Sequence, residues 1–182
     1  GWYTRYSQPL TEFRLPQKMD ERETLAVQIG WDGWALMEAI YHNPTAPAGV
    51  RNLEALEILR QVWLQQYVLV EGKLRWRDRK EMPSSARLIQ SPFDLEAHYS
   101  RKRTMEWVGY KVHLTETCND DAPHLITHVL TTDATEQDVD AVEPVHEGLA
   151  ALDCLPHEHL VDMGYTSAPL LLDSRENYGV NL

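Results

Sequence analysis

The chain has 182 residues, of which 43% are hydrophobic and 25% charged, and this composition excludes a disordered or fibrous protein. A chain of this length can bury a core without disulfides or structural metals, and one or two domains fit it. Its formal net charge of -11 excludes nonspecific nucleic-acid binding through the whole surface, because contact with phosphates needs positive potential.

Two features predict a soluble cytoplasmic protein. No uninterrupted apolar run approaches the roughly 20 residues that a membrane helix requires, and the first ten residues lack the apolar core of a signal peptide. The only cysteines are Cys118 and Cys154. One disulfide is arithmetically allowed, but two isolated thiols are more typical of a reduced cytosolic protein.

The charge is distributed unevenly along the chain. Residues 1–70 carry six basic and eight acidic side chains, residues 71–111 carry ten and six, and residues 112–182 carry one and fourteen. The basic middle is therefore where an anion could bind. The alternative is that Glu71, Asp78 and Glu81 neutralise much of its first cluster on a solvated face.

The first part of the chain reads as helical. Residues 20–41 carry apolar side chains near helical spacing, and we expect Gly30 and Gly33 to divide them into two helices. Residues 52–67 carry one apolar stripe, which predicts a helix packed in its own core and, less directly, a partner-binding helix. A hairpin is expected over residues 67–77, around a Glu-Gly turn.

A linker over residues 82–85 places the domain boundary between a mainly helical region, 1–82, and a second domain, 83–182. After the linker, the spacing of apolar residues changes from a helical pattern to a mixture of strand and helix patterns. This pattern predicts the element order βββαβαβ for the second domain. Its expected elements are strands 87–93, 107–117 and 125–131, helix 136–152 with Thr135 as N-cap, strand 159–161, helix 169–178 and strand 179–182. The fold class is thus α+β or α/β, with a mixed sheet that resembles a partial ribonuclease H domain.

Two aspartates are the candidate catalytic residues. Asp162 follows a predicted parallel strand and precedes a Gly turn, where open α/β sheets place their ligands. Asp94 ends the first predicted strand, which lies beside the strand of Asp162 in a ribonuclease H sheet. Such a pair suits Mg²⁺, which takes oxygen ligands and one or two protein carboxylates. The alternative for Asp162 is that it caps the following helix.

Other chemistries are disfavoured by the sequence. His124 and His128 flank a predicted strand, where they are too far apart to bind one ion, and no CxxC or HExxH motif anchors zinc. There is no GxSxG motif or recognisable triad order. Gly30 and Gly33 lie inside a helical stretch, so they do not form a phosphate loop.

Several separated motifs resemble those of bacterial insertion-sequence transposases with a DDE catalytic domain, of the group called IS-eleven-eighty-two. The motifs are SPFDLEAHYSRKR at 91–103, WVGYKVHL at 107–114, HLIT at 124–127, TTDAT at 131–135 with Asp138, and HLVDMGY at 159–165. Residues 39–41 and 59–67 are similar to the upstream region of the same group. The resemblance therefore covers nearly the whole chain.

The resemblance implies an enzyme that cuts DNA at transposon ends and joins them to target DNA. In the family, three acidic residues hold two Mg²⁺ or Mn²⁺ ions. Asp162 matches the second acid, and Asp94 matches the first although its local motif differs from the Asp-Gly-Thr form of many relatives. The third, a glutamate, should follow a later strand and helix, and Glu176 is a poor substitute. We therefore expect an inactive fragment of a longer, homodimeric, nucleoid-associated enzyme.

Five further residues are candidates for DNA contact. The resemblance suggests that Lys102, Lys111 and Tyr165 contact phosphates or the DNA end, and that Arg101 and Arg103 add positive potential. Each has a solvated surface role as its alternative. Two other functions stay open for the whole chain: a noncatalytic DNA- or protein-binding remnant, and a ribonuclease H-like nuclease that hydrolyses without strand transfer.

Overall fold

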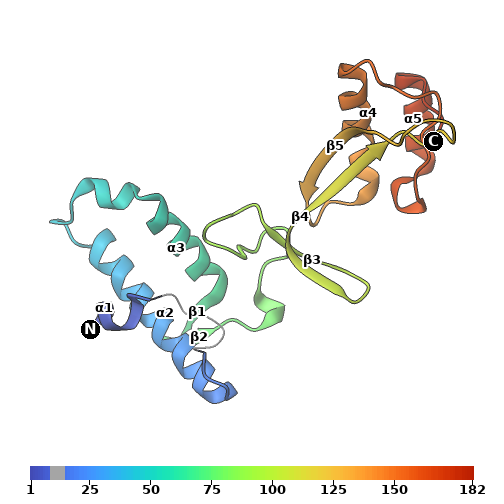
Figure 1. The fold of residues 1–182 in the computed structure, drawn as a ribbon. Helices are drawn as coiled ribbons and strands as arrows, with labels where there is room; N and C mark the ends of the chain where they lie inside the picture. The colour runs from blue at the N-terminus through green and yellow to red at the C-terminus, as the bar shows by residue number, and fades with distance from the viewer. Residues whose placement is uncertain (9–14) are drawn as a thin grey trace. The chain divides into compact units, whose positions relative to one another are not determined.

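The computed structural model describes residues 1–8 and 15–182, and the chain divides into two compact units, Gly1–Pro83 and Ser84–Leu182 (Figure 1). The expected linker, 82–85, spans the division. The fold is α+β, with a helical first unit and small antiparallel sheets. No helix in the described ranges combines the length and the apolar character needed to cross a bilayer.

The first unit packs α2 and α3 against a hairpin. Its elements are α1 Trp2–Tyr6, α2 Met19–Tyr41, the 3₁₀ turn η2 Ala48–Asn52, α3 Glu54–Gln66, β1 Tyr67–Val70, β2 Lys73–Trp76 and the 3₁₀ turn η3 Arg79–Glu81. The second predicted helix and the hairpin are confirmed. Glu71 and Gly72 have φ of 52° and 75°, the conformation that a two-residue hairpin turn requires. The apolar stripe of α3 packs inward, with Leu56 and Trp63 in the core.

The prediction that Gly30 and Gly33 break the first helix is wrong, because α2 runs through both. A Cβ on Gly30 would lie 2.6 Å from Cε1 of Tyr67, so glycine lets the neighbouring side chains approach the α2 backbone. Trp63 uses this approach and donates from Nε1 to the Gly30 carbonyl at 2.8 Å, while the Tyr67 hydroxyl donates to the Ala26 carbonyl at 2.8 Å. The glycines thus serve packing.

The second unit contains an antiparallel sheet with the order β3-β4-β5. Its strands are β3 His98–Lys102, β4 Met105–Glu116 and β5 Ile126–Asp133. The last two strands are confirmed, but the predicted strand 87–93 is wrong. Those residues form turns, in which the Ser84 carbonyl accepts from the amides of Arg87 and Leu88, and Pro92 cannot donate to a ladder. The polar sequence of β3 hid that strand.

The polar residues of β4 face the packed side of the sheet, and the apolar residues that alternate with them face solvent. Along β4, Lys111, His113 and Thr115 face the packed side, whereas Val112 and Leu114 are about 60% exposed. The packed side lies under α4 Val142–Ala151, which contributes buried Val145 and Leu149. The side chains of Lys111, His113 and Thr115 therefore lie on the inner face of the sheet.

The predicted helix 136–152 begins later than expected. A 3₁₀ turn, η4 Asp138–Ala141, leads into α4, and Thr135 is not its N-cap. Instead, Asp133 accepts hydrogen bonds from the amide and hydroxyl of Thr135, which forms a turn after β5. The last helix, α5 Ala168–Tyr178, is confirmed, with Ser167 accepting from the Leu170 amide at its start and Gly179 left-handed after its end.

The predicted parallel strands 159–161 and 179–182 are reduced to one parallel bridge between Glu158 and Asn181. Two hydrogen bonds make it: His159 N donates to Asn181 O at 2.8 Å, and Asn181 N donates to His157 O at 3.0 Å. The ladder extends no further because the chain turns soon afterwards into the 3₁₀ turn η5 Met163–Tyr165. Among the described residues, the mixed βββαβαβ sheet is therefore not formed.

Candidate functional site

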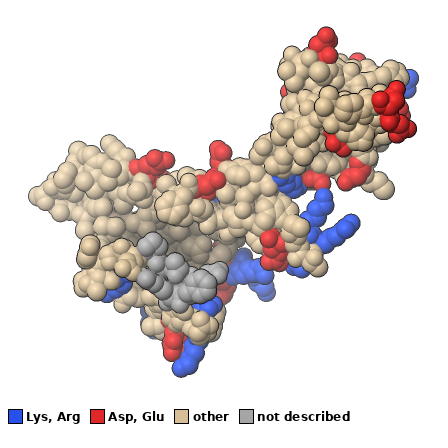
Figure 2. All heavy atoms as spheres, in the orientation of Figure 1, with Lys and Arg blue, Asp and Glu red and all other residues tan. Residues whose placement is uncertain are grey.

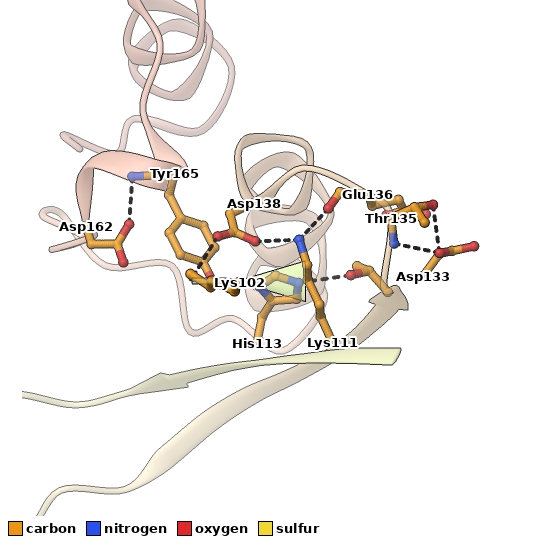
Figure 3. Close-up of polar contacts among 11 residues, drawn as sticks. Lys102, Lys111, His113, Asp133, Thr135, Glu136, Asp138, Asp162 and Tyr165 are labelled. Carbon is orange, nitrogen blue, oxygen red and sulfur yellow. Dashed lines mark hydrogen bonds and ion pairs between the residues drawn. The ribbon is translucent and has the colours of Figure 1, made fainter. Parts of the chain in front are cut away.

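Two lysines from the sheet converge on one carboxylate (Figure 3). Lys111 of β4 donates from Nζ to Asp138 Oδ1 at 2.9 Å and to the Glu136 carbonyl at 2.5 Å. Lys102, at the end of β3, lies with Nζ 3.4 Å from Asp138 Oδ2. Each ammonium group therefore meets a different oxygen of the same carboxylate, at the start of η4.

The positive charges of the two lysines favour the ionised form of the Asp138 carboxyl. Partial burial opposes ionisation of Asp138, but the hydrogen bonds and positive charges of Lys111 and Lys102 outweigh it and lower the pKa of the carboxyl. The two lysines differ in accessibility, since the side chain of Lys111 is 21% exposed and that of Lys102 is 67% exposed. Lys111 is held from two sides, and Lys102 is open to solvent.

A buried histidine lies beside the lysines on the inner face of β4. The Nδ1 atom of His113 lies 2.7 Å from the Tyr165 hydroxyl, and its Nε2 lies 3.0 Å from the Thr132 hydroxyl. Burial lowers the pKa of His113; the negative charge of Asp138 opposes this shift without reversing it, and the positive charge of Lys111 adds to it. Burial also raises the pKa of Tyr165, with Asp138 and Asp162 adding to the effect. A neutral imidazole thus connects the sheet to the η5 turn.

Asp162 lies at the other end of that turn. Its Oδ1 accepts from the Gly164 amide at 2.7 Å, so the side chain caps η5, the alternative role that the sequence left open. A Cβ on Gly164 would lie 2.9 Å from Asp162 Oδ1 and 3.4 Å from Asp138 Oδ2. The two carboxylates therefore flank the same side of this glycine, and its lack of a side chain leaves the space between them open.

Asp94 lies in the turns that precede β3. Its Oδ1 accepts from the Tyr110 hydroxyl at 2.8 Å and from the amides of Glu96 and Ala97. The hydrogen bond to Asp94 raises the pKa of Tyr110 to about 12. Tyr110 alternates with Lys111 along β4 and points to the opposite face. The structure therefore does not bring Asp94 to the face where Asp162 lies.

A metal ion fits these residues only in part. Over residues 1–8 and 15–182, no three His, Cys, Asp or Glu side chains are grouped so that they could hold one. Mg²⁺ can take as few as one or two protein carboxylates, and Asp162 has the oxygen chemistry it prefers. Asp94 does not join Asp162, so the pair expected from the sequence is not assembled.

The remaining basic residues lie outside the cluster. Arg101 donates to the Arg103 carbonyl and lies 3.6 Å from Glu106, which places both arginines at the turn between β3 and β4. Figure 2 shows Lys and Arg atoms gathered at this hairpin. Among the basic side chains at 73–87, Arg75 forms a double hydrogen bond with Glu81 at 2.6 and 2.7 Å. This pair agrees with the alternative that acidic neighbours neutralise these basic side chains on a solvated face.

Sequence reasoning missed the roles of His113 and Asp138. Lys111 and His113 are two residues apart on a strand and therefore share a face, a signal that the alternation already carried. Asp138 begins η4, and no local pattern connects it to lysines 27 and 36 positions earlier. No family model, curated protein or solved structure matches the chain.

Proposed function

We propose that the unit Ser84–Leu182 is part of a catalytic domain of the DDE transposase type, which acts on DNA in the full enzyme. The observation that carries this proposal is that three separated motifs bring side chains together on one face of the sheet. Lys111 and His113 come from the motif at 107–114, Asp138 from the segment after β5, and Tyr165 from the motif at 159–165. Motifs that agree with one family in order, and also gather in space, are what a shared site requires.

In this proposal, Asp162 supplies one acidic ligand, and Lys102, Lys111 and Tyr165 lie beside the DNA strand. Mg²⁺ or Mn²⁺, when bound, would activate an attacking oxygen and stabilise a leaving one in phosphodiester cleavage. The protein's own part is to hold the Asp162 carboxylate through the Gly164 amide and to hold Lys111 and Lys102 on the neighbouring carboxylate of Asp138. The partners are transposon-end and target DNA, the full enzyme acts as a homodimer, and its location is the bacterial cytoplasm.

Binding of Mn²⁺ tests the proposal. Paramagnetic broadening of the Gly164 amide resonance, followed during a Mn²⁺ titration, is expected in the natural chain and is expected to vanish in Asp162→Asn. Asp173→Asn is the matched control, because it removes one carboxylate charge from exposed α5. Equal broadening in the natural chain and in Asp162→Asn would remove Asp162 from the proposed site.

A second function is favoured by the separation of Asp94 from Asp162. A noncatalytic DNA-binding protein needs the lysine cluster but no pair of carboxylates. It would bind a labelled DNA duplex equally well with Mg²⁺ and with a chelator, and Asp162→Asn would leave that binding unchanged. Cleavage of the duplex that depends on Mg²⁺ and on Asp162 would exclude it.

A further inference from the structure

We propose that Asp138 occupies, inside the protein, the position that a nucleic-acid phosphate takes between Lys102 and Lys111. The inference rests on the proposed function in one respect, namely that this unit contacts DNA. It adds a regulatory contact to the same surface: an internal carboxylate that competes with the phosphate for the two lysines.

The geometry of the contact is that of a bridging anion. The two oxygens of Asp138 each take one ammonium group, with Nζ–O distances of 2.9 Å to Lys111 and 3.4 Å to Lys102. A phosphodiester also presents two non-bridging oxygens and one negative charge. The carboxylate is therefore a match for the phosphate in charge and in the number of acceptor oxygens, and the two anions repel each other when both lie against the same lysines.

The two lysines are held with unequal strength. Lys111 keeps a second acceptor, the Glu136 carbonyl, and its side chain is mostly buried. Lys102 has the longer contact and a side chain that is 67% exposed. Exposed ion pairs of this kind stabilise little. A phosphate arriving from solvent would therefore take Lys102 from Asp138 first, while Lys111 stays anchored.

The surrounding charge makes this competition matter. The unit Ser84–Leu182 contains six basic and seventeen acidic side chains, so its long-range field repels DNA. Attraction of DNA therefore has to come from a local group of basic side chains. Asp138 neutralises one of the two positive charges that Lys102 and Lys111 supply to that group. Removal of that single carboxylate charge should therefore raise DNA affinity.

The test is a fluorescence-anisotropy titration of a labelled DNA duplex with the 182-residue chain, in a chelating buffer. We expect Asp138→Asn to bind about fivefold more tightly, from the repulsion between two unit charges about 4 Å apart in water. The slope of log affinity against log salt should steepen by about 0.9, the value for one additional phosphate contact. Asp173→Asn, which makes the same change in net charge, should do neither. An unchanged or weakened affinity in Asp138→Asn would overturn the proposal.

Two further variants separate competition from a structural role of Asp138. In the natural background, Lys102→Gln should cost less affinity than Arg103→Gln, because Asp138 already neutralises Lys102. In the Asp138→Asn background, Lys102→Gln should cost more than it does in the natural one. The comparison in the natural background does not depend on the folding of Asp138→Asn. A larger loss from Lys102→Gln than from Arg103→Gln there contradicts the proposal.

Inorganic phosphate distinguishes the two sources of the anion. If Asp138→Asn binds free phosphate more tightly but DNA no more tightly, the assignment to a nucleic-acid backbone is wrong. All of these measurements are made without divalent metal, so they are independent of the Mn²⁺ test of Asp162. Loss of the metal result together with a gain of DNA affinity in Asp138→Asn would reject the catalytic proposal and leave this one standing.

Discussion

The ring of His146, which is fully buried, lies against that of His159. Nε2 of His146 is 3.2 Å from Nδ1 of His159, and the ring centroids are 5.4 Å apart. The ring of Tyr178 covers His146 from α5, at 5.3 Å between centroids. The second ring nitrogen of His146 is buried without a hydrogen-bond partner in the described part of the chain. The pair therefore joins α4, the segment before Asp162, and α5 while both imidazoles are neutral.

This contact makes the second unit sensitive to acid. Burial and the neighbouring His159 lower the pKa of His146 to about 4, and burial lowers the pKa of His159. A lowered histidine pKa in the folded state means that the unfolded state binds more protons between pH about 4 and about 6.5. Stability is therefore complete above about 6.5 and falls as pH falls towards about 4, by on the order of 3 kcal/mol for His146. Urea unfolding across this range measures it.

The control for this prediction is a neighbouring exposed histidine. His146→Gln should flatten the pH dependence of unfolding, because a neutral side chain takes up no proton. His157→Gln should leave it intact, since His157 is exposed. A pH dependence that survives in His146→Gln would show that other groups carry it.

Gly30 offers a test of the first unit. In Gly30→Ala, the new Cβ would lie 2.6 Å from Tyr67 and 2.7 Å from Leu74, both side chains of the core or its margin. Overpacking outweighs the gain in helix propensity, and we expect a net loss of about 1–2 kcal/mol. Gly33→Ala gains the same propensity with a nearest approach of 3.1 Å, so its loss should be smaller. Denaturant unfolding followed by Trp fluorescence compares them, and equal effects would contradict the packing role.

The Tyr165 hydroxyl is expected to set the tautomer of the His113 imidazole. Tyr165→Phe leaves the buried Nδ1 of His113 without its partner, which should cost about 1–3 kcal/mol. The imidazole ¹⁵N shifts should report a changed tautomer balance. Tyr178→Phe is the matched control, because the Tyr178 hydroxyl has no hydrogen bond within the described ranges. Unaltered His113 shifts in Tyr165→Phe would show that the contact is not formed in solution.

The inverted faces of the sheet predict unequal effects of two apolar truncations. Leu149 of α4 is 1% exposed and packs on the inner face, so Leu149→Ala should cost about 2–5 kcal/mol. Val112 is 61% exposed on the outer face, and Val112→Ala should change stability by no more than about 0.5 kcal/mol. Thermal unfolding of the two variants measures the difference. A large loss in Val112→Ala would mean that the outer face is covered in solution.

Local pattern was sufficient for elements whose signal lies within a few residues. The stripe of α3, the Glu71-Gly72 turn and the helix α5 were predicted because apolar spacing and turn residues are properties of short segments. The same reasoning failed for α2, where Gly30 is tolerated because Tyr67 and Trp63 pack against it from a distant part of the sequence. A helix propensity cannot include such a contact.

The sequence alone determined the helical first half, two of the three strands of the sheet and a basic segment with Lys102 and Lys111 inside an acidic chain. Only the tertiary structure decided which face of β4 is packed and which carboxylates meet. It placed Asp138 between the lysines and Asp94 against Tyr110. The reason is that alternation fixes which residues share a face, whereas the partner of that face comes from loops and helices far along the chain.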